Sequence, residues 1–281
     1  MSHFLKLDEK KIRKGKPIGL PYIGSKKKIS KKIVEIIKQN FGTGLPVYDV
    51  FGGGGAITAE LLLNGIPVHY NDLDSNITEM FMRVVSQDRE WLKTLIVSRD
   101  DFFIIRDKKN ETVDDRLKLL INSFGNTSRS YLYGEKWSDE KYNLATRIIK
   151  EHDVFGGYKR TETYKTATRL EQLERLQQLE RLQQLEVTNH DYKAFSNVEN
   201  AIFYLDPPYE NTKNLYNFKF DHQSFYDWCV EMAKKNIVIV SSYVITDPRF
   251  EIAFEFKKAH GTLGRGQQTS KYERLYMIKN N

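Results

Sequence analysis

The motif Asp206-Pro207-Pro208-Tyr209 carries groups that could act on an amino group. An Asp carboxylate accepts hydrogen bonds, and the stiff backbone of two prolines can fix the Pro207 carbonyl as a second acceptor beside it. An exocyclic amino group has two hydrogens to donate and suits two such acceptors. Tyr209 adds a flat ring on which a base could stack. A turn that simply ends a strand, with Asp206 as a cap, is the competing interpretation.

The apolar residues before this motif predict a buried strand. Residues 201–205 form a continuous apolar run, and the prolines that follow cannot donate to a sheet ladder. The strand must therefore stop at the motif, which leaves Asp206 and Tyr209 at its carboxyl end. In open α/β sheets, ligands bind at that edge.

A second strand near the N-terminus leads into a glycine-rich loop. Residues 46–51 predict a strand and residues 56–63 predict a helix, with only glycines between them. A loop without side chains lets a ligand approach the backbone and the helix N-terminus closely. The third glycine of the dinucleotide-binding fingerprint is missing, which weakens a dinucleotide interpretation. The loop residues are Gly52, Gly53, Gly54 and Gly55.

An acidic residue ends the next predicted strand. Residues 67–70 predict this strand, and Asp72 follows it about 20 residues past the glycine loop. In that position a carboxylate could accept hydrogen bonds from both hydroxyls of a ribose. The alternative is a cap for the helix predicted at residues 75–85. The preceding glycine loop favours the ribose.

The residues before the first predicted helix could hold an anion. Gly24, Ser25 and Lys26 precede a helical pattern that starts at Ile29, with Ser25 as the predicted N-cap. Backbone donors and a lysine charge at a helix start can bind a carboxylate or phosphate. Taken alone, this stretch is interpreted equally well as a capped helix with a solvated lysine run.

Predicted strands and helices alternate on both sides of a long central segment. Residues 1–85 and 187–281 carry the strands, including a buried one at 237–242 and an antiparallel pair within 254–278. We therefore predict an α/β, doubly wound, Rossmann-like sheet formed by residues 1–85 and 187–281. A mainly helical domain, residues 86–186, would be inserted into it.

The central segment is polar, aromatic and basic. Residues 122–133 and 155–160 mix amides, hydroxyls, rings and cations, the groups that read base edges and grip phosphates. Surface loops of a helical domain are the alternative. In residues 170–185 a leucine recurs at every third position within a repeated hexapeptide. That spacing does not make a coiled-coil seam, but the residue types predict a helix.

The composition fits a globular protein with a polyanionic partner. Lysine and arginine number 44 against 37 aspartate and glutamate residues, a formal net charge of +7 among 281 residues. The single Cys229 excludes an internal disulfide framework and a multi-cysteine metal site, and favours a reducing cytoplasm. No signal-type or membrane-spanning stretch is present, so we expect a soluble protein without a membrane partner.

In this order, the motifs resemble those of the Dam-type class of DNA adenine N6-methyltransferases, including phage, solitary bacterial and restriction-modification forms. The resemblance covers most of residues 17–85 and 187–281. The matching stretches are Pro21-Tyr22-Ile23-Gly24-Ser25-Lys26, Asp49-Val50-Phe51-Gly52-Gly53-Gly54, Asn71-Asp72-Leu73-Asp74 and Asp206-Pro207-Pro208-Tyr209.

The resemblance implies that S-adenosylmethionine lies across the glycine loop. Asp72 would bind its ribose, Asp191 and Tyr192 would flank its adenine, and Tyr22 and Lys26 would approach its methionine half. The cofactor-binding residues implied by the resemblance are Tyr22, Gly24, Lys26, Asp49, Phe51, Gly52, Gly53, Gly54, Asp72, Asp191 and Tyr192.

The resemblance also implies how the reaction proceeds. A target adenine is flipped out of double-stranded DNA and stacked against groups that include Tyr209. Asp206 and the Pro207 carbonyl accept hydrogen bonds from its N6 amine, whose lone pair then attacks the sulfonium methyl in line. Positioning and electrostatics are sufficient for this reaction, with no metal. The catalytic residues would be Asp206, Pro207, Pro208 and Tyr209.

The partners follow from the same resemblance. Double-stranded DNA would contact Arg129, Tyr131 and Lys136, and a cognate restriction endonuclease is a further candidate partner. The central segment departs from the pattern of the GATC enzymes at residues 123–126 and 130–133, so we do not carry the GATC sequence over. The alternatives are a cytosine N4 DNA methyltransferase and a non-catalytic module that binds nucleic acid or protein.

Overall fold

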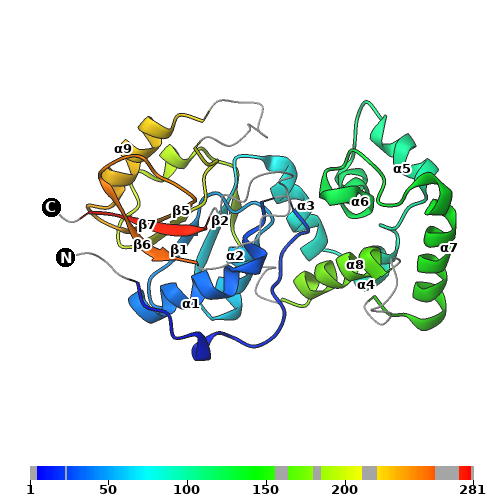
Figure 1. Ribbon diagram of the computed structural model, residues 1–281, viewed down its shortest axis with the longest axis horizontal. Coiled ribbons are helices and arrows are strands. Elements are labelled where there is room, and N and C mark those ends of the chain that lie inside the picture. Colours follow the sequence, from blue (N-terminus) through cyan, green and yellow to red (C-terminus); the bar gives the residue numbers. More distant parts are fainter. Residues whose placement is uncertain are drawn as a thin grey trace.

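A computed structural model of the protein describes residues 5–22, 24–155, 164–179, 185–210, 220–256 and 272–279. Within them a seven-stranded sheet lies among helices, and a second group of helices gathers at one end of the molecule (Figure 1). Three predicted features fall outside the described residues in whole or part. They are residues 156–160, residues 180–184 of the leucine repeat and residues 257–271 within the range of the predicted antiparallel pair.

The sheet has the strand order β3-β2-β1-β4-β5-β7-β6. The pairs from β3 to β5 are all parallel, whereas β7 runs antiparallel to both β5 and β6. The predicted antiparallel pair is therefore confirmed, but its first strand begins at Phe250, before the predicted range of 254–278. The strands are β1 (Val47–Asp49), β2 (Val68–Asn71), β3 (Val187–Thr188), β4 (Ile202–Leu205), β5 (Ile237–Ser242), β6 (Phe250–Glu255) and β7 (Arg274–Ile278).

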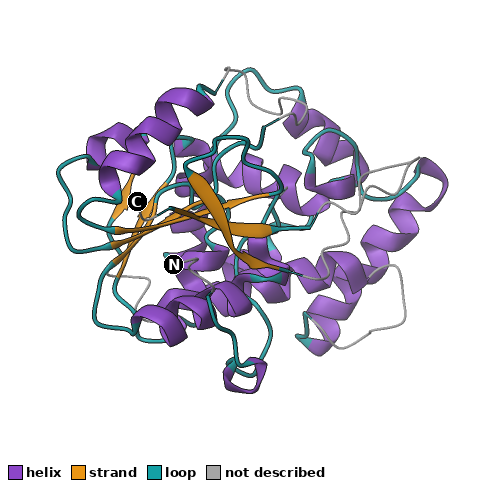
Figure 2. Ribbon diagram, turned by 60° about the vertical axis from the view of Figure 1, so that its left-hand side comes forward, coloured by secondary structure: helices purple, strands orange, loops and turns teal. Residues whose placement is uncertain are grey.

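Helices cover both faces of this sheet (Figure 2). Along β4, Ile202 and Tyr204 pack in one hydrophobic cluster with α1 (Ser30–Phe41) and α2 (Ala56–Leu63). The alternate residues of β4 pack in another cluster with α9 (His222–Met232). A strand buried on both faces reads as an unbroken apolar run, which is why the sequence predicted it. The doubly wound α/β architecture is confirmed.

The strand order reverses between β1 and β4, which are parallel neighbours. From β1 the chain continues to β2 and β3 on one side, and from β4 it continues to β5 on the other. The carboxyl ends of β1 and β4 therefore diverge into loops that leave a crevice between them. Phe51 and the glycine loop follow β1, and Asp206 follows β4, so the topology alone brings these two motifs together.

The central segment is helical, and its helices pack together beside the sheet (Figure 1). One hydrophobic cluster joins α3 to α4, α6, α7 and α8. Helix α3 ends at the predicted domain boundary, residue 85, and packs in the same cluster as the helices of the predicted inserted domain. The division into two domains at that residue therefore stays a prediction. The helices are α3 (Ser75–Val85), α4 (Arg89–Lys93), α5 (Arg99–Arg106), α6 (Val113–Asn122), α7 (Glu135–His152) and α8 (Tyr164–Gln177).

The predicted helix in the leucine repeat is confirmed for residues 170–177, which belong to α8, and not for residues 178, 179 and 185, which lie outside it. Leu170, Leu173 and Leu176 have no exposed surface. Each step of three residues turns the side chain by about 60°, so three leucines sweep only a third of the helix circumference. That arc packs against α3, α4 and α6. The helix ends at Gln177, and Leu179 and Leu185 beyond it are partly buried against the same core.

Two local predictions are wrong. Ser25 does not cap the long helix: its hydroxyl accepts from the backbone N–H of Lys27 and caps a short 3₁₀ helix, η2 (Lys26–Lys28), while α1 begins at Ser30. The second concerns residues 187–192, whose sequence predicts a strand, because only the first two of them form one. Asp191 accepts from the Lys193 N–H and starts another 3₁₀ turn, η5 (Tyr192–Phe195).

Replacing Leu173 with Ala should lower the free energy of unfolding by about 2 to 5 kcal/mol, because a fully buried leucine leaves a cavity in the core shared by α3 and α8. Chemical denaturation with a circular-dichroism readout measures the change. The control is Gln178→Ala, in the exposed turn that follows the same helix. A loss at Leu173 no larger than that of the control would contradict the packing of α8.

Candidate active site

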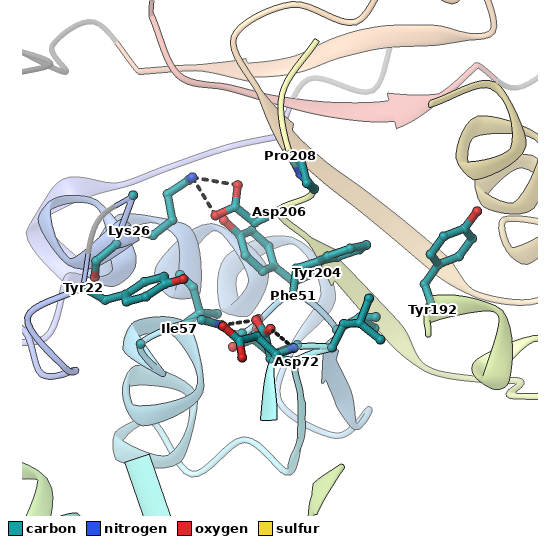
Figure 3. A pocket seen from close by; sticks show the side chains of 18 of the residues that line it. Tyr22, Lys26, Phe51, Ile57, Asp72, Tyr192, Tyr204, Asp206 and Pro208 are labelled. Atoms are coloured by element: carbon teal, nitrogen blue, oxygen red, sulfur yellow. Dashed lines mark hydrogen bonds and ion pairs between the residues drawn. The ribbon is translucent and has the colours of Figure 1, made fainter. Parts of the chain in front are cut away.

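A cavity of about 680 Å³ opens where β1 and β4 end. Its walls come from the loop before α1, the glycine loop, the end of β2, η5 and the end of β4. Lys26 faces Asp206 in one part of the cavity, with Asp72 and Tyr192 in others (Figure 3). The predicted site residues that line it are Tyr22, Gly24, Lys26, Asp49, Phe51, Gly52, Gly53, Gly54, Asp72, Asp191, Tyr192, Asp206 and Pro208.

Asp206 is paired with Lys26 across the cavity. The Lys26 Nζ lies 2.7 Å from Oδ1 and 2.6 Å from Oδ2 of Asp206, and the two side chains are only 12% and 16% exposed. The resemblance implied that Lys26 approaches the methionine half of the cofactor. Here its ammonium binds the carboxylate of the Asp-Pro-Pro-Tyr motif. A buried carboxylate needs such a partner, because an isolated charge there would be strongly disfavoured.

The hydroxyl of Tyr209 belongs to the same network. It lies 2.5 Å from the Lys26 Nζ, 3.0 Å from the Asp206 Oδ1 and 2.5 Å from the Oε1 of Glu273. Its ring meets the Tyr243 ring edge to face at 4.7 Å. Tyr209 is not among the described residues that line the cavity. Its ring therefore packs beside the cavity, and its hydroxyl contacts Lys26 and Asp206.

Burial raises the pKa of Asp206 to about 6, since the desolvated carboxylate loses its water. The Lys26 ammonium opposes this rise, and the nearby charge of Glu273 adds to it. For Lys26, desolvation acts to lower the pKa, but Asp206 and Glu273 outweigh it and the pKa is raised. The lysine therefore stays charged at neutral pH, and the carboxylate titrates much closer to neutrality than a free aspartate does.

The backbone of the two prolines is held from α9. Nε2 of His222 donates to the Pro208 carbonyl at 2.9 Å, which assigns the proton to that ring nitrogen. Pro207 is buried and does not appear among the described residues that line the cavity. His222 was not identified from the sequence, because no pattern there connects it with Pro208, which lies 14 residues before it.

The glycine loop is shaped by the aromatic rings behind it. A Cβ atom at Gly52 would lie 2.3 Å from the Tyr70 ring, and one at Gly55 would lie 2.2 Å from the Phe81 ring. The Tyr70 hydroxyl also donates to the Gly53 carbonyl at 2.7 Å. These glycines are therefore required by packing as well as by any ligand. The open backbone that the sequence suggested is the face of the loop that borders the cavity.

Two aspartates hold the backbone around the glycine loop: Asp72 binds the loop itself, and Asp49 binds the helix α2 that follows it. Asp72 accepts from the Gly53 N–H at 2.8 Å through Oδ2 and from the Asp74 N–H at 2.9 Å through Oδ1. Asp49, at the end of β1, accepts from both the N–H and the hydroxyl of Thr58 on α2. Burial raises the pKa of Asp49 to about 7 and raises that of Asp72. Each carboxylate keeps further lone pairs for a ligand.

Aromatic residues form the part of the cavity near η5. The Tyr192 ring meets those of Phe225 and Trp228 edge to face, at 5.2 Å and 5.1 Å. Phe220 lies before α9 and contacts both Tyr192 and Phe51. Several further lining residues belong to none of the sequence motifs, namely Asn76 on α3, Lys193 in η5, and His190, Phe220 and Asp221 outside helices and strands.

The residues predicted to contact DNA do not share one environment. Arg129 and Lys136 are exposed, and the Lys136 ammonium lies 5.1 Å above the ring of the exposed Trp137. Tyr131 is 7% exposed, packs in a hydrophobic cluster and donates to the Val97 carbonyl at 2.9 Å. Its side chain supports the central segment from within, and the DNA surface proposed below does not include it. Phe124 is 67% exposed, and it was not named individually from the sequence as a residue that could contact DNA.

Two further properties concern only the part of the chain that the structure describes. No group of three or more His, Cys, Asp or Glu side chains there could hold a metal ion. None of its helices combines the length and apolar character needed to cross a membrane.

Known proteins share this arrangement of motifs. A family model described as the D12 class of N6 adenine-specific DNA methyltransferases matches residues 22–236, from the loop before η2 to the start of β5. The chain belongs to this family. The match includes the glycine loop, Asp72 and the Asp-Pro-Pro-Tyr motif, and it does not favour the cytosine alternative.

Individual relatives of this family member are distant. The modification methylase StsI of Streptococcus sanguinis is 26% identical over 226 residues, which cover 74% of this chain and 31% of that methylase. The chain thus spans about a third of the length of that relative. A putative methyltransferase from Escherichia coli, yhhF, is 12% identical, with 93% of this chain and 92% of that one covered at a TM-score of 0.38.

Replacing Gly52 with Ala should lower the free energy of unfolding by about 1 to 3 kcal/mol, because the new methyl group would overlap the Tyr70 ring. Thermal unfolding monitored by fluorescence measures the change. Gly44→Ala is the matched control, since a Cβ there would meet no described atom within 4 Å. Equal stability of the two variants would contradict the packing of the loop on Tyr70.

Proposed function

We propose that the protein methylates N6 of adenine in double-stranded DNA, with S-adenosylmethionine as the methyl donor. The observation that carries this proposal is the position of Asp206. Its carboxylate lies at the carboxyl end of β4 and faces a cavity whose other walls include the glycine loop and Asp72. Membership of an adenine-specific methyltransferase family supports the choice of base.

The residues around the cavity fit S-adenosylmethionine. The volume lies within the usual range for small-molecule sites. Asp72 offers carboxylate lone pairs to the ribose hydroxyls, and Tyr192 offers a ring beside the adenine, with Asp191 next to it. The Lys26 ammonium and the Tyr22 ring border the part that would receive the methionine half. When bound, S-adenosylmethionine supplies a methyl group activated by its sulfonium, with a neutral leaving group.

Asp206 orients the amine that receives the methyl group. A carboxylate has about four lone-pair sites, so Asp206 can bind Lys26 and still accept a hydrogen from the adenine N6. The Pro207 carbonyl is the second acceptor in this proposal. Hydrogen bonds to both amine hydrogens draw the nitrogen lone pair out of the ring plane and toward the cofactor. The contribution of the protein is orientation and electrostatic stabilisation.

The DNA surface proposed here lies on the central segment and includes Arg129 and Lys136. Phe124 and Trp137 are exposed rings on the same segment, and the Lys136 ammonium lies over the Trp137 ring. Exposed rings and cations together suit bases and phosphates. Asn126, two residues from Phe124, donates to the Pro21 carbonyl and so ties this turn to the loop that carries Lys26. The net charge of +7 supports a polyanionic partner.

Two wider features of the proposal follow from the same reaction. A cytoplasmic location would place the protein with its DNA substrate and its cofactor. A cognate restriction endonuclease is proposed as a functional partner because a similar protein is named a modification methylase. The recognised base sequence would then be shared by the two enzymes.

The test is incubation of unmethylated genomic DNA with the protein and labelled S-adenosylmethionine, followed by nucleoside mass spectrometry and methylation-aware sequencing. We expect labelled N6-methyladenine in a fixed sequence context. Labelled N4-methylcytosine would contradict the choice of base. Cofactor binding without any labelled base would contradict the choice of DNA as substrate.

Asp206→Ala should reduce methyl transfer by about a hundredfold or more while leaving the affinity for S-adenosylmethionine nearly unchanged, because the carboxylate acts on the substrate amine. Single-turnover assays and calorimetry measure the two quantities. Asp227→Ala, at an exposed site on α9 outside the cavity, is the control and should keep both values. Turnover retained by Asp206→Ala would remove the catalytic role of Asp206.

Asp72→Ala should weaken the binding of S-adenosylmethionine by about ten- to a hundredfold, since a charged acceptor for the ribose hydroxyls contributes on the order of 1.5 to 3 kcal/mol. Isothermal titration calorimetry against the same Asp227→Ala control measures the loss. Cofactor affinity equal to that of the control would disprove the ribose contact.

A further inference from the structure

Glu273 is a buried carboxylate directed at the Asp-Pro-Pro-Tyr motif from the far end of the chain. It lies just before β7 and is 4% exposed. Its Oε1 accepts from the Ser241 hydroxyl at 2.7 Å and from the Tyr209 hydroxyl at 2.5 Å, and lies 3.8 Å from the Lys26 Nζ. A buried carboxylate is costly unless its contacts compensate for the lost water.

These contacts are not needed to hold the strand. The backbone carbonyl of Glu273 accepts from the Phe256 N–H at 2.9 Å, in line with the β6–β7 ladder. An apolar side chain at this position would satisfy the same ladder. The acidic side chain therefore relates to the groups that it faces.

The position of one proton decides what those groups can do. The Tyr209 hydroxyl accepts from Lys26, and its single proton can go either to Glu273 at 2.5 Å or to the Asp206 Oδ1 at 3.0 Å. The shorter contact favours Glu273. Burial raises the pKa of Tyr209 well above its ordinary value, so the hydroxyl keeps that proton at neutral pH.

We propose that Glu273 is a positioning residue that holds the proton of Tyr209 away from Asp206 and thereby leaves the Asp206 carboxylate free to accept from the target amine. This inference rests on the proposed methyltransferase function. Without Glu273, the Tyr209 hydroxyl would turn to Asp206 and occupy an acceptor position that the amine needs.

Glu273 also acts through its charge. Desolvation is the largest cause of the raised pKa of Asp206, and the negative charge of Glu273 raises it further. Removing that charge should therefore move the pKa of Asp206 down. Because the ionised carboxylate is the stronger acceptor and protonation turns one of its oxygens into a donor, the acid limb of the pH–rate profile would move to lower pH. The titratable groups that face Glu273 are Lys26 from η2, Tyr204, Asp206 and Tyr209 from β4 and its end, and Tyr243 from the end of β5.

The test is Glu273→Gln, which keeps the shape of the side chain and removes its charge. The amide oxygen that remains is a weaker acceptor than the Asp206 carboxylate, so the Tyr209 proton should turn to Asp206. Single-turnover methylation is measured between about pH 5 and 9, together with the affinity for S-adenosylmethionine. We expect the rate plateau to fall about ten- to a hundredfold, the acid limb to shift to lower pH and the cofactor affinity to stay within about twofold.

The matched control is Glu255→Gln. Glu255 lies on the adjacent strand β6 and binds Arg274, and its side chain is 40% exposed. The same chemical change is thus made in the same strand pair, away from the network, and it should leave the rate and the pH profile of the wild-type protein unchanged.

A double variant shows whether Glu273 acts through Tyr209. With Tyr209→Phe the contested proton is gone, so adding Glu273→Gln should lower the rate plateau by less than about twofold more. Losses that multiply in full would contradict the proposal. So would a rate and pH profile of Glu273→Gln that match those of Glu255→Gln.

The experiment also separates a failure of the proposed function from a failure of the Glu273 variant to fold. Wild-type protein that methylates no DNA disproves the proposed function, whatever Glu273 does. If Glu273→Gln does not fold, Ser241→Ala tests the same contact, because it removes the donor that holds Glu273 while leaving its charge. We expect a lower rate plateau without a fall in cofactor affinity, and an unchanged plateau would overturn the proposal.

Discussion

The contact between Lys26 and Asp206 joins a cation and an anion where little water can reach them. Removing two charges from water is unfavourable, and their attraction compensates only when further hydrogen bonds complete the arrangement. Tyr209 and Glu273 supply those bonds, and Ser241 completes them. The network therefore requires the loop before α1, the end of β4, strand β5 and the residue before β7 to meet at one point. The order of the sheet is what makes this meeting possible.

Much of this arrangement could be predicted from the sequence because it depends on local patterns. An apolar run that stops at two prolines fixes both the burial of β4 and the position of Asp206 at its end. Glycines between a strand and a helix fix the loop after β1. The partners of Asp206 could not be predicted in this way. Lys26 binds Asp206 across 180 residues, and Glu273 joins the same network through Tyr209, which is 64 residues away from it. No periodicity encodes which loops of a sheet come together.

The central segment also shows that local sequence patterns do not determine which residues are buried. Arg129 and Tyr131 are neighbours in a stretch rich in polar and aromatic residues, yet one is exposed and the other packs inside. Burial there depends on α5 and α6, whose contacts are not visible in the stretch itself. The leucine repeat was predicted as a helix from residue types alone. Its packing through one arc of the helix follows from the core that α3, α4 and α6 form with it, which the repeat itself does not encode.

The place of β7 in the sheet has a consequence for how the protein is made. β7 lies between β5 and β6, both of which precede it in the chain, and it carries Glu273 at its start. During synthesis, β6 therefore cannot take its final place until β7 emerges, and the free edge of β5 stays open until then. The hydroxyls of Ser241 and Tyr209 likewise cannot form their hydrogen bonds to Glu273 until that residue has been synthesised. The network around Asp206 can therefore be completed only after β1 to β6 and then β7 have been synthesised, so most of the sheet can form before this network does.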